Sequence, residues 1–248
     1  MSRRAFFVAI AVFALIGGRL LANHGIRSFA AAPSGTGGIV FAASVGHLAG
    51  SSGAWAVRQP VAPESVDGVN DIDPHKAFGS KSAPIVMEIF SDYQCPACRQ
   101  YFETTNRPLM DNYVSTGKVF LIHRDFPLPM HAYSRIAARY ARAAAEVGKI
   151  EPVEQALFDN QEKWEQTGDV DGTVAAALTP AEMAKVRALV KGGTLEPLIN
   201  KDYELGEMYR VSQTPTTVFH YKGQTYPYAG EMNYEILSQF LNQLLNQR

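Results

Sequence analysis

Cysteine is scarce in this chain: among its 248 residues there are two, Cys95 and Cys98. Two cysteines cannot form the disulfide framework of a small secreted scaffold, and a bridge between them closes too short a loop to stabilise a fold greatly. A zinc site needs about four ligands, and without a second C-x-x-C it would have to draw on His123 and His131. We therefore expect no metal and no other cofactor, and a cysteine pair that serves redox chemistry.

The chain also lacks an excess of charge of either sign. Its formal net charge is −1 at pH 7, so it has no general attraction for polyanions and we expect no nucleic-acid partner. Hydrophobic residues make up 46% of the sequence, as in an ordinary globular protein. A chain of this length can hold one sizeable domain and an appendage.

Charged residues are missing altogether from a long stretch near the N-terminus. Residues 28–57 contain no Asp, Glu, Lys or Arg and are rich in Ala, Gly and Ser. Such a segment has few large side chains to bury, so the entropy cost of ordering it is hard to offset. We expect a flexible linker over residues 23–80. Because this linker is too poor in apolar residues to build a dimerisation module, a monomer is expected.

Residues 1–22 are typical of an export signal or a membrane anchor. Arg3 and Arg4 precede an uncharged apolar run that ends before Arg19. This run is shorter than the roughly 20 residues that span a bilayer, which favours a cleaved signal peptide; an anchor is the alternative if the run continues past Arg19. The two arginines also resemble the twin-arginine export pattern. Either route delivers the domain to the periplasm or another extracytoplasmic compartment, where disulfides persist.

The cysteine pair lies between a strand pattern and a helix pattern. Residues 84–90 form a short apolar run typical of a buried strand, and the helix is expected to continue to about Tyr113, with Pro108 kinking or dividing it. A C-x-x-C at such a junction places its first sulfur beside free backbone N–H groups and the positive end of the helix dipole. This environment favours the thiolate, which is the reactive form. The pattern predicts thiol–disulfide chemistry; a structural disulfide and half a metal site are the alternatives.

The rest of the chain returns to sheet only near its end. A strand is expected at residues 119–123 and a hairpin at residues 216–228, followed by an amphipathic helix that ends near Leu245. Helices are expected between them, over residues 133–147, 152–164, 180–190 and 195–209. This order predicts an α/β domain over residues 81–248, with a helical insertion at about residues 130–209.

Several motifs together resemble the DsbA-like branch of the thioredoxin superfamily. They are Phe90-Ser91-Asp92-Tyr93-Gln94-Cys95-Pro96-Ala97-Cys98, Phe126-Pro127-Leu128, His131, the alanine-rich helix, Leu157-Phe158, Trp164 and Thr214-Pro215-Thr216. The resemblance extends over about residues 77–245. It implies a thioredoxin fold with a helical domain inserted between the second and third strands. It also implies disulfide exchange with exported proteins that carry free thiols.

The resemblance implies roles for four residues in the chemistry. Cys95 would be the attacking sulfur that forms mixed disulfides, and Cys98 the buried resolving sulfur. Pro215 would be a cis-proline that faces both. Glu88 occupies a strand position at which the family often has a buried acid that carries protons to the resolving cysteine; a solvent-facing position is the alternative.

Other residues are implied in binding and support. Thr214 would offer backbone hydrogen bonds to an extended substrate, in the manner of an added strand. Pro96 and Ala97, which separate the cysteines, would contact the same substrate. His131 is expected to cap a helix rather than to take part in catalysis.

The direction of electron flow is left open by these motifs. Pro-Ala replaces the Pro-His of the strongest oxidants, which predicts a less stabilised thiolate and a milder oxidant. We expect a disulfide donor that is reoxidised by a membrane quinone-linked partner. A disulfide isomerase, a reductase of specific clients, and a non-catalytic tethered binding module or holdase are the alternatives.

Overall fold

The computed structural model describes Val69 and residues 71–247. The signal or anchor expected at residues 1–22, and the linker up to residue 68, therefore lie outside the described residues. Within the described part, no helix is both long and apolar enough to cross a membrane.

The linker was expected to continue to residue 80, but the structure has regular elements before that residue. A short 3₁₀ helix, η2 (Pro74–Lys76), and a two-residue strand, β1 (Ala77–Phe78), occupy its last residues. The Lys76 side chain is 1% exposed and contacts Asp125. Two residues are too few to give a strand pattern in the sequence, so the long-range contact of Lys76, rather than local propensity, fixes this segment.

The sheet has five strands in the order β1-β3-β2-β4-β5. Its four longer strands are β2 (Ile85–Ser91), β3 (Val119–Asp125), β4 (Thr216–Tyr221) and β5 (Gln224–Ala229). β2 pairs in parallel with β3 and antiparallel with β4, whereas β1 and β5 join the edges antiparallel. Every residue of β2 except its last is buried, as expected for an apolar strand at the centre of a sheet.

The helical segment that begins at Pro96 is continuous, but it alternates between α-helical and π-helical turns. α1 (Pro96–Tyr101) and the three-residue α2 (Arg107–Leu109) alternate with π-helical turns at Phe102–Asn106 and Met110–Val114. Pro108, which lacks an N–H to donate, lies in the short α2 between these wider turns. The helix thus reaches Val114, and the proline coincides with a change of helix type rather than with a break.

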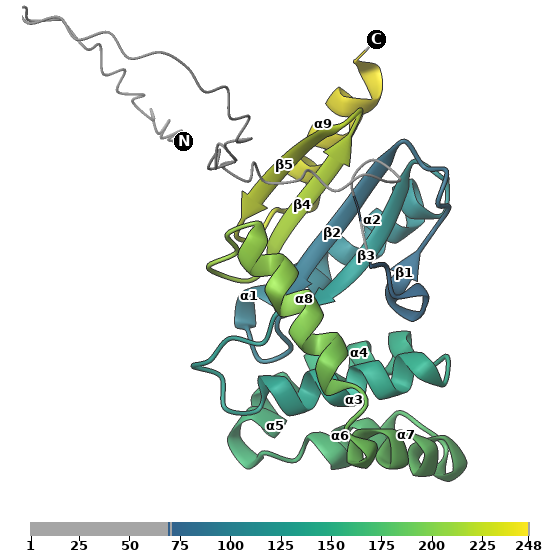
Figure 1. Ribbon diagram of the computed structural model, residues 1–248, viewed down its shortest axis with the longest axis vertical. Coiled ribbons are helices and arrows are strands. Elements are labelled where there is room, and N and C mark those ends of the chain that lie inside the picture. The colour runs from purple at the N-terminus through teal and green to yellow at the C-terminus, as the bar shows by residue number, and fades with distance from the viewer. Residues whose placement is uncertain (1–68, 70, 248) are drawn as a thin grey trace, which may run out of the picture. The chain divides into compact units, whose positions relative to one another are not determined.

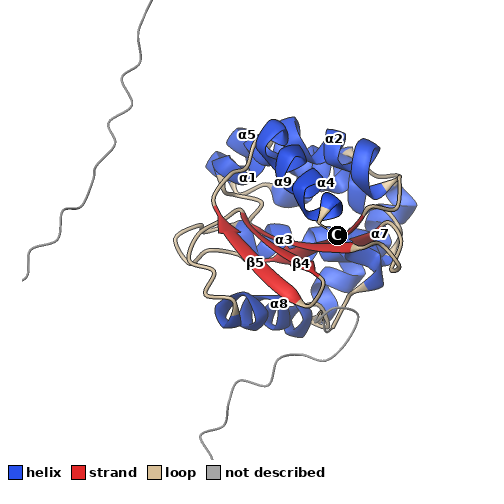
Figure 2. Ribbon diagram, turned by 90° about the horizontal axis from the view of Figure 1, so that it is seen from above, coloured by secondary structure: helices blue, strands red, loops and turns tan. Residues whose placement is uncertain are grey.

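The two faces of the sheet are covered by different helices (Figures 1 and 2). On one face, Met87 and Ile89 pack with Leu109 of α2 and Leu237 of α9 (Tyr234–Asn246). On the other face lies α8 (Glu196–Met208), beside which Phe90, Phe126 and Val218 form a separate cluster. Gly206 of α8 permits this approach, because a Cβ atom there would lie 2.5 Å from the Phe126 ring.

The helical insertion between β3 and β4 lies at the lower end of Figure 1, and its core also includes Tyr93, Cys95 and Cys98. Its helices are α3 (Ser134–Glu146), α4 (Ile150–Asp159), α5 (Gln161–Thr167), α6 (Val170–Ala176), α7 (Pro180–Gly192) and α8. Alanines of α3 are fully buried and let neighbouring helices approach closely, while Trp164 is 0% exposed and donates its indole N–H to Leu157 O at 2.6 Å. The expected α/β domain with an inserted helical block is confirmed.

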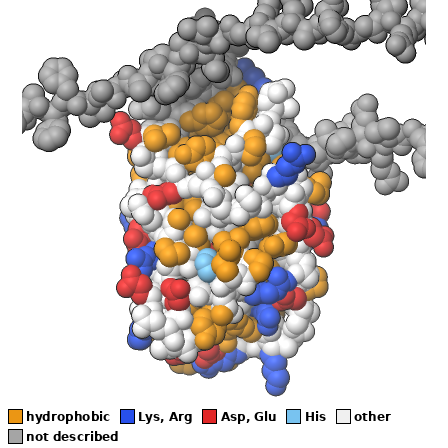
Figure 3. All heavy atoms as spheres, turned by 90° about the vertical axis from the view of Figure 1, so that its left-hand side faces the viewer, with side chains coloured by type: hydrophobic (Ala, Val, Ile, Leu, Met, Phe, Trp, Pro, Cys, Tyr) orange, Lys and Arg blue, Asp and Glu red, His pale blue; other side chains and the backbone are white. Residues whose placement is uncertain are grey.

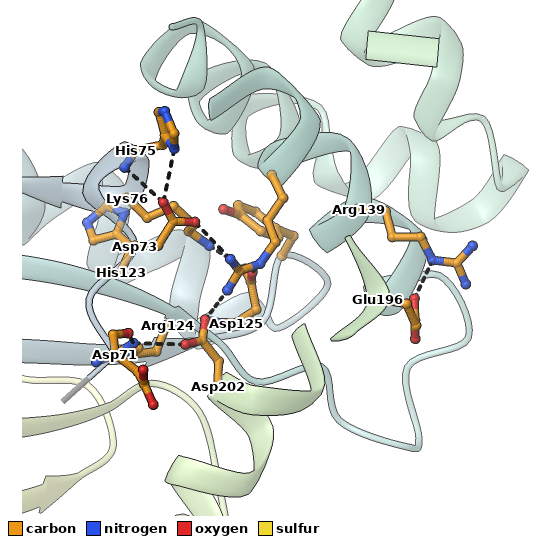
Figure 4. A network of polar contacts seen from close by, with 12 residues as sticks. Asp71, Asp73, His75, Lys76, His123, Arg124, Asp125, Arg139, Glu196 and Asp202 are labelled. Atoms are coloured by element: carbon orange, nitrogen blue, oxygen red, sulfur yellow. Dashed lines mark hydrogen bonds and ion pairs between the residues drawn. The ribbon is translucent and has the colours of Figure 1, made fainter. Parts of the chain in front are cut away.

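A network of buried charged side chains joins the N-terminal segment, the sheet and the insertion (Figure 4). Its members, each with a side chain at most 5% exposed, are Lys76, Glu88, Arg124, Asp125, Arg142 and Asp202. Arg142 of α3 is central to it: its Nε lies 2.5 Å from Asp125 Oδ2, its Nη1 lies 3.0 Å from Asp73 Oδ2, and its Nη2 contacts Asp202. Removing one partner from a buried ion pair leaves an uncompensated charge, which is far more costly than the pair is stabilising.

We predict that Arg142→Met lowers the free energy of unfolding by about 3–5 kcal/mol, because Asp125 and Asp202 keep buried charges without this cation. Arg187→Met is the matched control, since Arg187 pairs with Asp171 at an exposed site and such pairs contribute little. Guanidinium unfolding of both variants measures the difference. Equal losses in the two variants would show that the buried network does not hold the insertion to the sheet.

Candidate active site

Cys95 lies where β2 gives way to α1. It is the N-cap residue of α1 and has extended backbone angles, φ −80° and ψ 121°, while Pro96 takes the first helical position. Its carbonyl accepts hydrogen bonds from the N–H groups of Cys98 and Arg99, both at 3.1 Å. Pro96 is exposed and Ala97 half-buried. The strand-to-helix junction expected from the sequence is therefore present.

The two cysteines have opposite environments. Cys95 is 8% exposed and Cys98 1% exposed, and both are free thiols. A hydrogen bond from the Cys98 thiol, aided by Thr214 and the N–H groups of Cys98 and Ala97, lowers the pKa of Cys95 to about 6 against the effect of burial. Burial, together with the neighbouring Cys95, raises the pKa of Cys98 well above its ordinary value. Near neutral pH, Cys95 is thus the thiolate and Cys98 holds the proton.

The loop before β4 completes the site. The Thr214–Pro215 peptide bond is cis, as the resemblance implied. Thr214 O lies 3.3 Å from Cys95 Sγ and accepts a hydrogen bond from it when Cys95 is protonated. The fold thus brings four of the expected site residues together, although the cysteines and this loop are far apart in sequence. This loop lies against the sulfur that is expected to react.

Gln161 of α5 is a site residue that the sequence patterns did not indicate. Its side chain is buried, and its Nε2 donates to Tyr93 O at 2.7 Å and to Cys95 O at 3.1 Å. The helical insertion therefore holds the turn that carries the reactive cysteine. A polar residue on a short helix gave no signal, because its partners are backbone atoms of a distant turn.

Asp92 organises the other side of the turn. Its carboxylate accepts bonds from the N–H groups of Gln94 and Leu128, at 2.8 and 2.7 Å, and lies 2.8 Å from His131 Nδ1. Burial raises the pKa of Asp92, and its own N–H lies 3.5 Å from Cys98 Sγ. The capping role expected of His131 is wrong: α3 begins without a side-chain cap, because the imidazole is engaged by Asp92.

Glu88 is fully buried, but it faces away from the cysteines. It lies 2.7 Å from Arg124 Nε and 2.9 Å from His220 Nε2, and these partners outweigh the effect of burial and lower its pKa. Alternate residues of a strand face opposite sides of the sheet, and Ile89, not Glu88, lines the space beside Cys98. The geometry therefore does not place Glu88 to carry protons to the resolving cysteine.

Acidic and basic side chains do lie behind Cys98, but they come from other elements. The Tyr93 hydroxyl donates to Glu154 Oε1 at 2.7 Å, and His123 Nδ1 lies 3.1 Å from the same oxygen. Glu154 of α4 is 4% exposed. A carboxylate at an apolar position of an amphipathic helix, in register with Ile150 and Leu157, is the signal that would have singled it out.

The two histidines considered above as further metal ligands each contact a carboxylate: His123 pairs with Glu154 and His131 with Asp92. In the described part of the chain, one group of potential ligands, Asp73, His75 and Glu146, lies within 4.8 Å. The Asp73 carboxylate there already accepts the His75 N–H and pairs with Arg142.

Comparison with known proteins agrees with this geometry. The sequence model of the family described as Thioredoxin matches residues 72–243. The chain belongs to this family. The chain is 25% identical over 162 residues to Disulfide bond formation protein D of Bacillus subtilis strain 168, covering 62% of this chain and 71% of that protein. It is 28% identical over 176 residues to the Na(+)/H(+) antiporter NhaA 3 of Salinispora tropica, covering 70% of this chain but only 25% of the antiporter.

Solved structures of this thioredoxin-family fold include DsbA-type proteins. A thioredoxin-like oxidoreductase from Silicibacter pomeroyi superposes with a TM-score of 0.59 at 22% identity, covering 71% of this chain and 95% of that one. Oxidised BdbD from Bacillus subtilis superposes with a TM-score of 0.57 at 20% identity, covering 69% of this chain and 93% of that one. Wolbachia pipientis alpha-DsbA1 superposes with a TM-score of 0.57 at 16% identity, covering 68% of this chain and 89% of that one. The described chain therefore has the DsbA-like thioredoxin fold.

We predict that the reduced protein is alkylated by iodoacetamide with a rate that is half-maximal near pH 6, the pKa of Cys95, because only the thiolate reacts. In Cys98→Ala this midpoint should move toward the roughly pH 8.5 of a free cysteine, since the Cys98 thiol is the largest cause of the shift. Alkylation rates across pH, followed by mass spectrometry, measure both. An unchanged midpoint in the variant would contradict the coupling of the two thiols.

Proposed function

We propose that this thioredoxin-family protein is an extracytoplasmic thiol–disulfide oxidoreductase that acts mainly as an oxidant of exported proteins with free thiols. The observation that carries the proposal is the contrast between the thiols: the pKa of Cys95 is about 6, whereas burial raises that of Cys98. A sulfur with a low pKa leaves easily, and a stabilised thiolate favours the reduced pair. Both effects favour passing the disulfide on.

The proposed exchange has two steps. A substrate thiolate attacks Cys95 Sγ of the oxidised pair, the Cys95–Cys98 bond breaks, and Cys98 leaves and takes up one proton. A second substrate thiolate then attacks the substrate sulfur of the mixed disulfide and releases Cys95 as a thiolate. Two electrons pass from the substrate dithiol to the cysteine pair. Reoxidation is assigned to a membrane quinone-linked partner.

The surroundings of Cys95 support an extended, unfolded substrate. The loop of Thr214 lies against Cys95 Sγ, and a substrate that adds to this loop as a strand would bring its own sulfur to Cys95. Pro96 and Ala97 lie at the start of α1, and Met130 is 76% exposed. Figure 3 shows the side on which α1 lies, where hydrophobic side chains surround a histidine. An apolar rim of this kind suits unfolded chains.

The equilibrium reduction potential of the Cys95–Cys98 pair decides the direction. For an oxidant without a histidine between its cysteines we expect a value between about −120 and −180 mV in glutathione buffers. A value near roughly −270 mV would instead assign a reductase. Failure to equilibrate with glutathione would reject the enzyme and favour a binding module.

A trapping experiment tests the exchange itself. Cys98→Ala should accumulate mixed disulfides between Cys95 and exported proteins, because the resolving sulfur is missing. Cys95→Ala, the control, should trap none, since Cys98 is buried. Non-reducing gels of extracts from the export compartment, with and without dithiothreitol, give the result. Equal trapping by both variants would contradict the assignment of Cys95 as the attacking sulfur.

A further inference from the structure

Two hydrogen-bond donors meet at the sulfur of Cys98. The Asp92 N–H donates to Cys98 Sγ, with 3.5 Å between nitrogen and sulfur, and the Ser91 hydroxyl donates a second hydrogen bond to the same sulfur. Ser91 is the last residue of β2 and lies on the same face of the strand as Ile89, which also borders the space beside Cys98. Both cysteines are free thiols in this structure, so the donors contact the sulfur where it lies once the disulfide has opened.

Disulfide exchange places a negative charge on this sulfur. When a substrate thiolate attacks Cys95 Sγ, a new S–S bond forms, the Cys95–Cys98 bond breaks, and its electron pair passes to Cys98 Sγ. Cys98 therefore leaves as a thiolate before it takes up a proton. Because Cys98 is 1% exposed, water cannot solvate this charge as it would at the surface. A buried charge without hydrogen-bond donors is costly, so the donors bear directly on this step.

We propose that the Ser91 hydroxyl and the Asp92 N–H form a thiolate hole, a pair of preorganised donors that stabilises the charge developing on Cys98 in the transition state of disulfide exchange. This inference rests on the proposed function, because it concerns the leaving sulfur of that reaction. Ser91 is thereby a catalytic residue, since its hydroxyl contacts a reacting atom. The same donors act in reverse, when the Cys98 thiolate attacks the mixed disulfide, so the inference holds for either direction of electron flow.

The Asp92 N–H is held in place by the other polar groups of its residue. The Asp92 carboxylate accepts the N–H groups of Gln94 and Leu128, and its carbonyl accepts the Cys95 N–H at 3.1 Å. With these bonds made, the Asp92 backbone has little freedom to turn away from Cys98. Donors that are fixed before the reaction stabilise a developing charge without a cost of reorganisation.

Ser91 is held in place by the sheet. It pairs with Asp125 in the register of β2 with β3, and its carbonyl accepts the Phe126 N–H at 2.8 Å. The strand therefore fixes the face on which the hydroxyl lies, and that face is the one with Cys98. Both donors of the thiolate hole thus belong to backbone that is already ordered.

The pKa of Cys98 reflects two opposing effects. Burial, followed by the neighbouring Cys95, raises this pKa, whereas the Asp92 N–H and the Ser91 hydroxyl lower it. Burial outweighs the donors, so reduced Cys98 is a neutral thiol near neutral pH. The donors therefore act on the short-lived thiolate more than on the stable oxidised and reduced forms. A thiolate hole should change the rate of exchange and leave its equilibrium nearly unchanged.

The experiment measures the expulsion of Cys98 in Ser91→Ala. Oxidised protein is mixed with excess dithiothreitol near pH 7 in a quenched-flow instrument, and the oxidised and reduced forms are separated by reversed-phase chromatography after acid quenching. Loss of one hydrogen bond to a charged sulfur should slow the reduction by about 10-fold. Thr105→Val is the matched control, because it removes a buried hydroxyl that bonds to Met232 O instead. It should keep the wild-type rate.

Two further measurements separate a catalytic role from a structural one. The equilibrium constant of Ser91→Ala with glutathione should stay within about twofold of wild type, because donors that act in the transition state leave the end states unchanged. The rate at which iodoacetamide alkylates Cys95 in the reduced protein should also be unchanged, because that reaction does not expel Cys98.

A matched pair of larger residues repeats the test. Ser91→Thr keeps a hydroxyl and Ser91→Val replaces it with a methyl group of similar size, and both β-branched residues suit a strand. Ser91→Thr should be reduced about 10-fold faster than Ser91→Val, since the two differ only in the donor. This comparison decides the question even where Ser91→Ala does not fold.

The outcomes are distinct. A reduction rate in Ser91→Ala equal to that of Thr105→Val, or equal rates in Ser91→Thr and Ser91→Val, overturns the inference and leaves the proposed function intact. A slower reduction of Ser91→Ala with an equal change in the equilibrium constant also overturns it, because the hydroxyl would then act on a stable form of the pair. A wild-type disulfide that exchanges with neither dithiothreitol nor glutathione would instead reject the proposed function.

Discussion

The network of buried charged side chains around Arg142 is the constraint on which the arrangement of the molecule depends. Lys76 precedes the sheet, Asp125 ends β3, Arg142 belongs to α3 and Asp202 to α8, so these ion pairs join four segments that are far apart in the sequence. Each charge is costly to bury and stable only with its partners present. The ion pairs therefore favour the arrangement in which every buried charge has its partner, and in that arrangement Lys76, Arg124 and Asp125 line the space behind Cys98.

The contrast between the cysteines follows from this arrangement. The helices that cover the sheet and α1 leave Cys98 1% exposed, whereas Cys95, beside Thr214, keeps 8% of its surface exposed. Because the buried thiol keeps its proton, it can donate a hydrogen bond to Cys95 and stabilise the thiolate there. One asymmetry of burial thus lowers the pKa of the first sulfur and raises that of the second.

The sequence predicted local features of the site well and the residues that support it poorly. The C-x-x-C junction and the proline before β4 were predictable because local rules govern them: an apolar strand, a helix start and a proline before a strand. The role of Glu88 came from the resemblance alone, because an apolar run does not show which of its residues face the cysteines. Glu88 lies on the opposite face of the sheet, where it contacts Arg124 and His220. Gln161 and His131 act on partners far along the chain, and β1 is too short for any periodicity.

The helical insertion contributes residues to the candidate active site. Gln161 of α5 donates a hydrogen bond to the Cys95 carbonyl, and Glu154 of α4 lines the space behind Cys98. Arg142 of α3 is the centre of the network of buried charged side chains. A thioredoxin fold stripped of these helices would retain the cysteine pair and the cis-proline loop. It would lose the buried carboxylate and the wall that encloses Cys98. Variation in the insertion is therefore a means of tuning the resolving cysteine while the C-x-x-C motif itself stays unchanged.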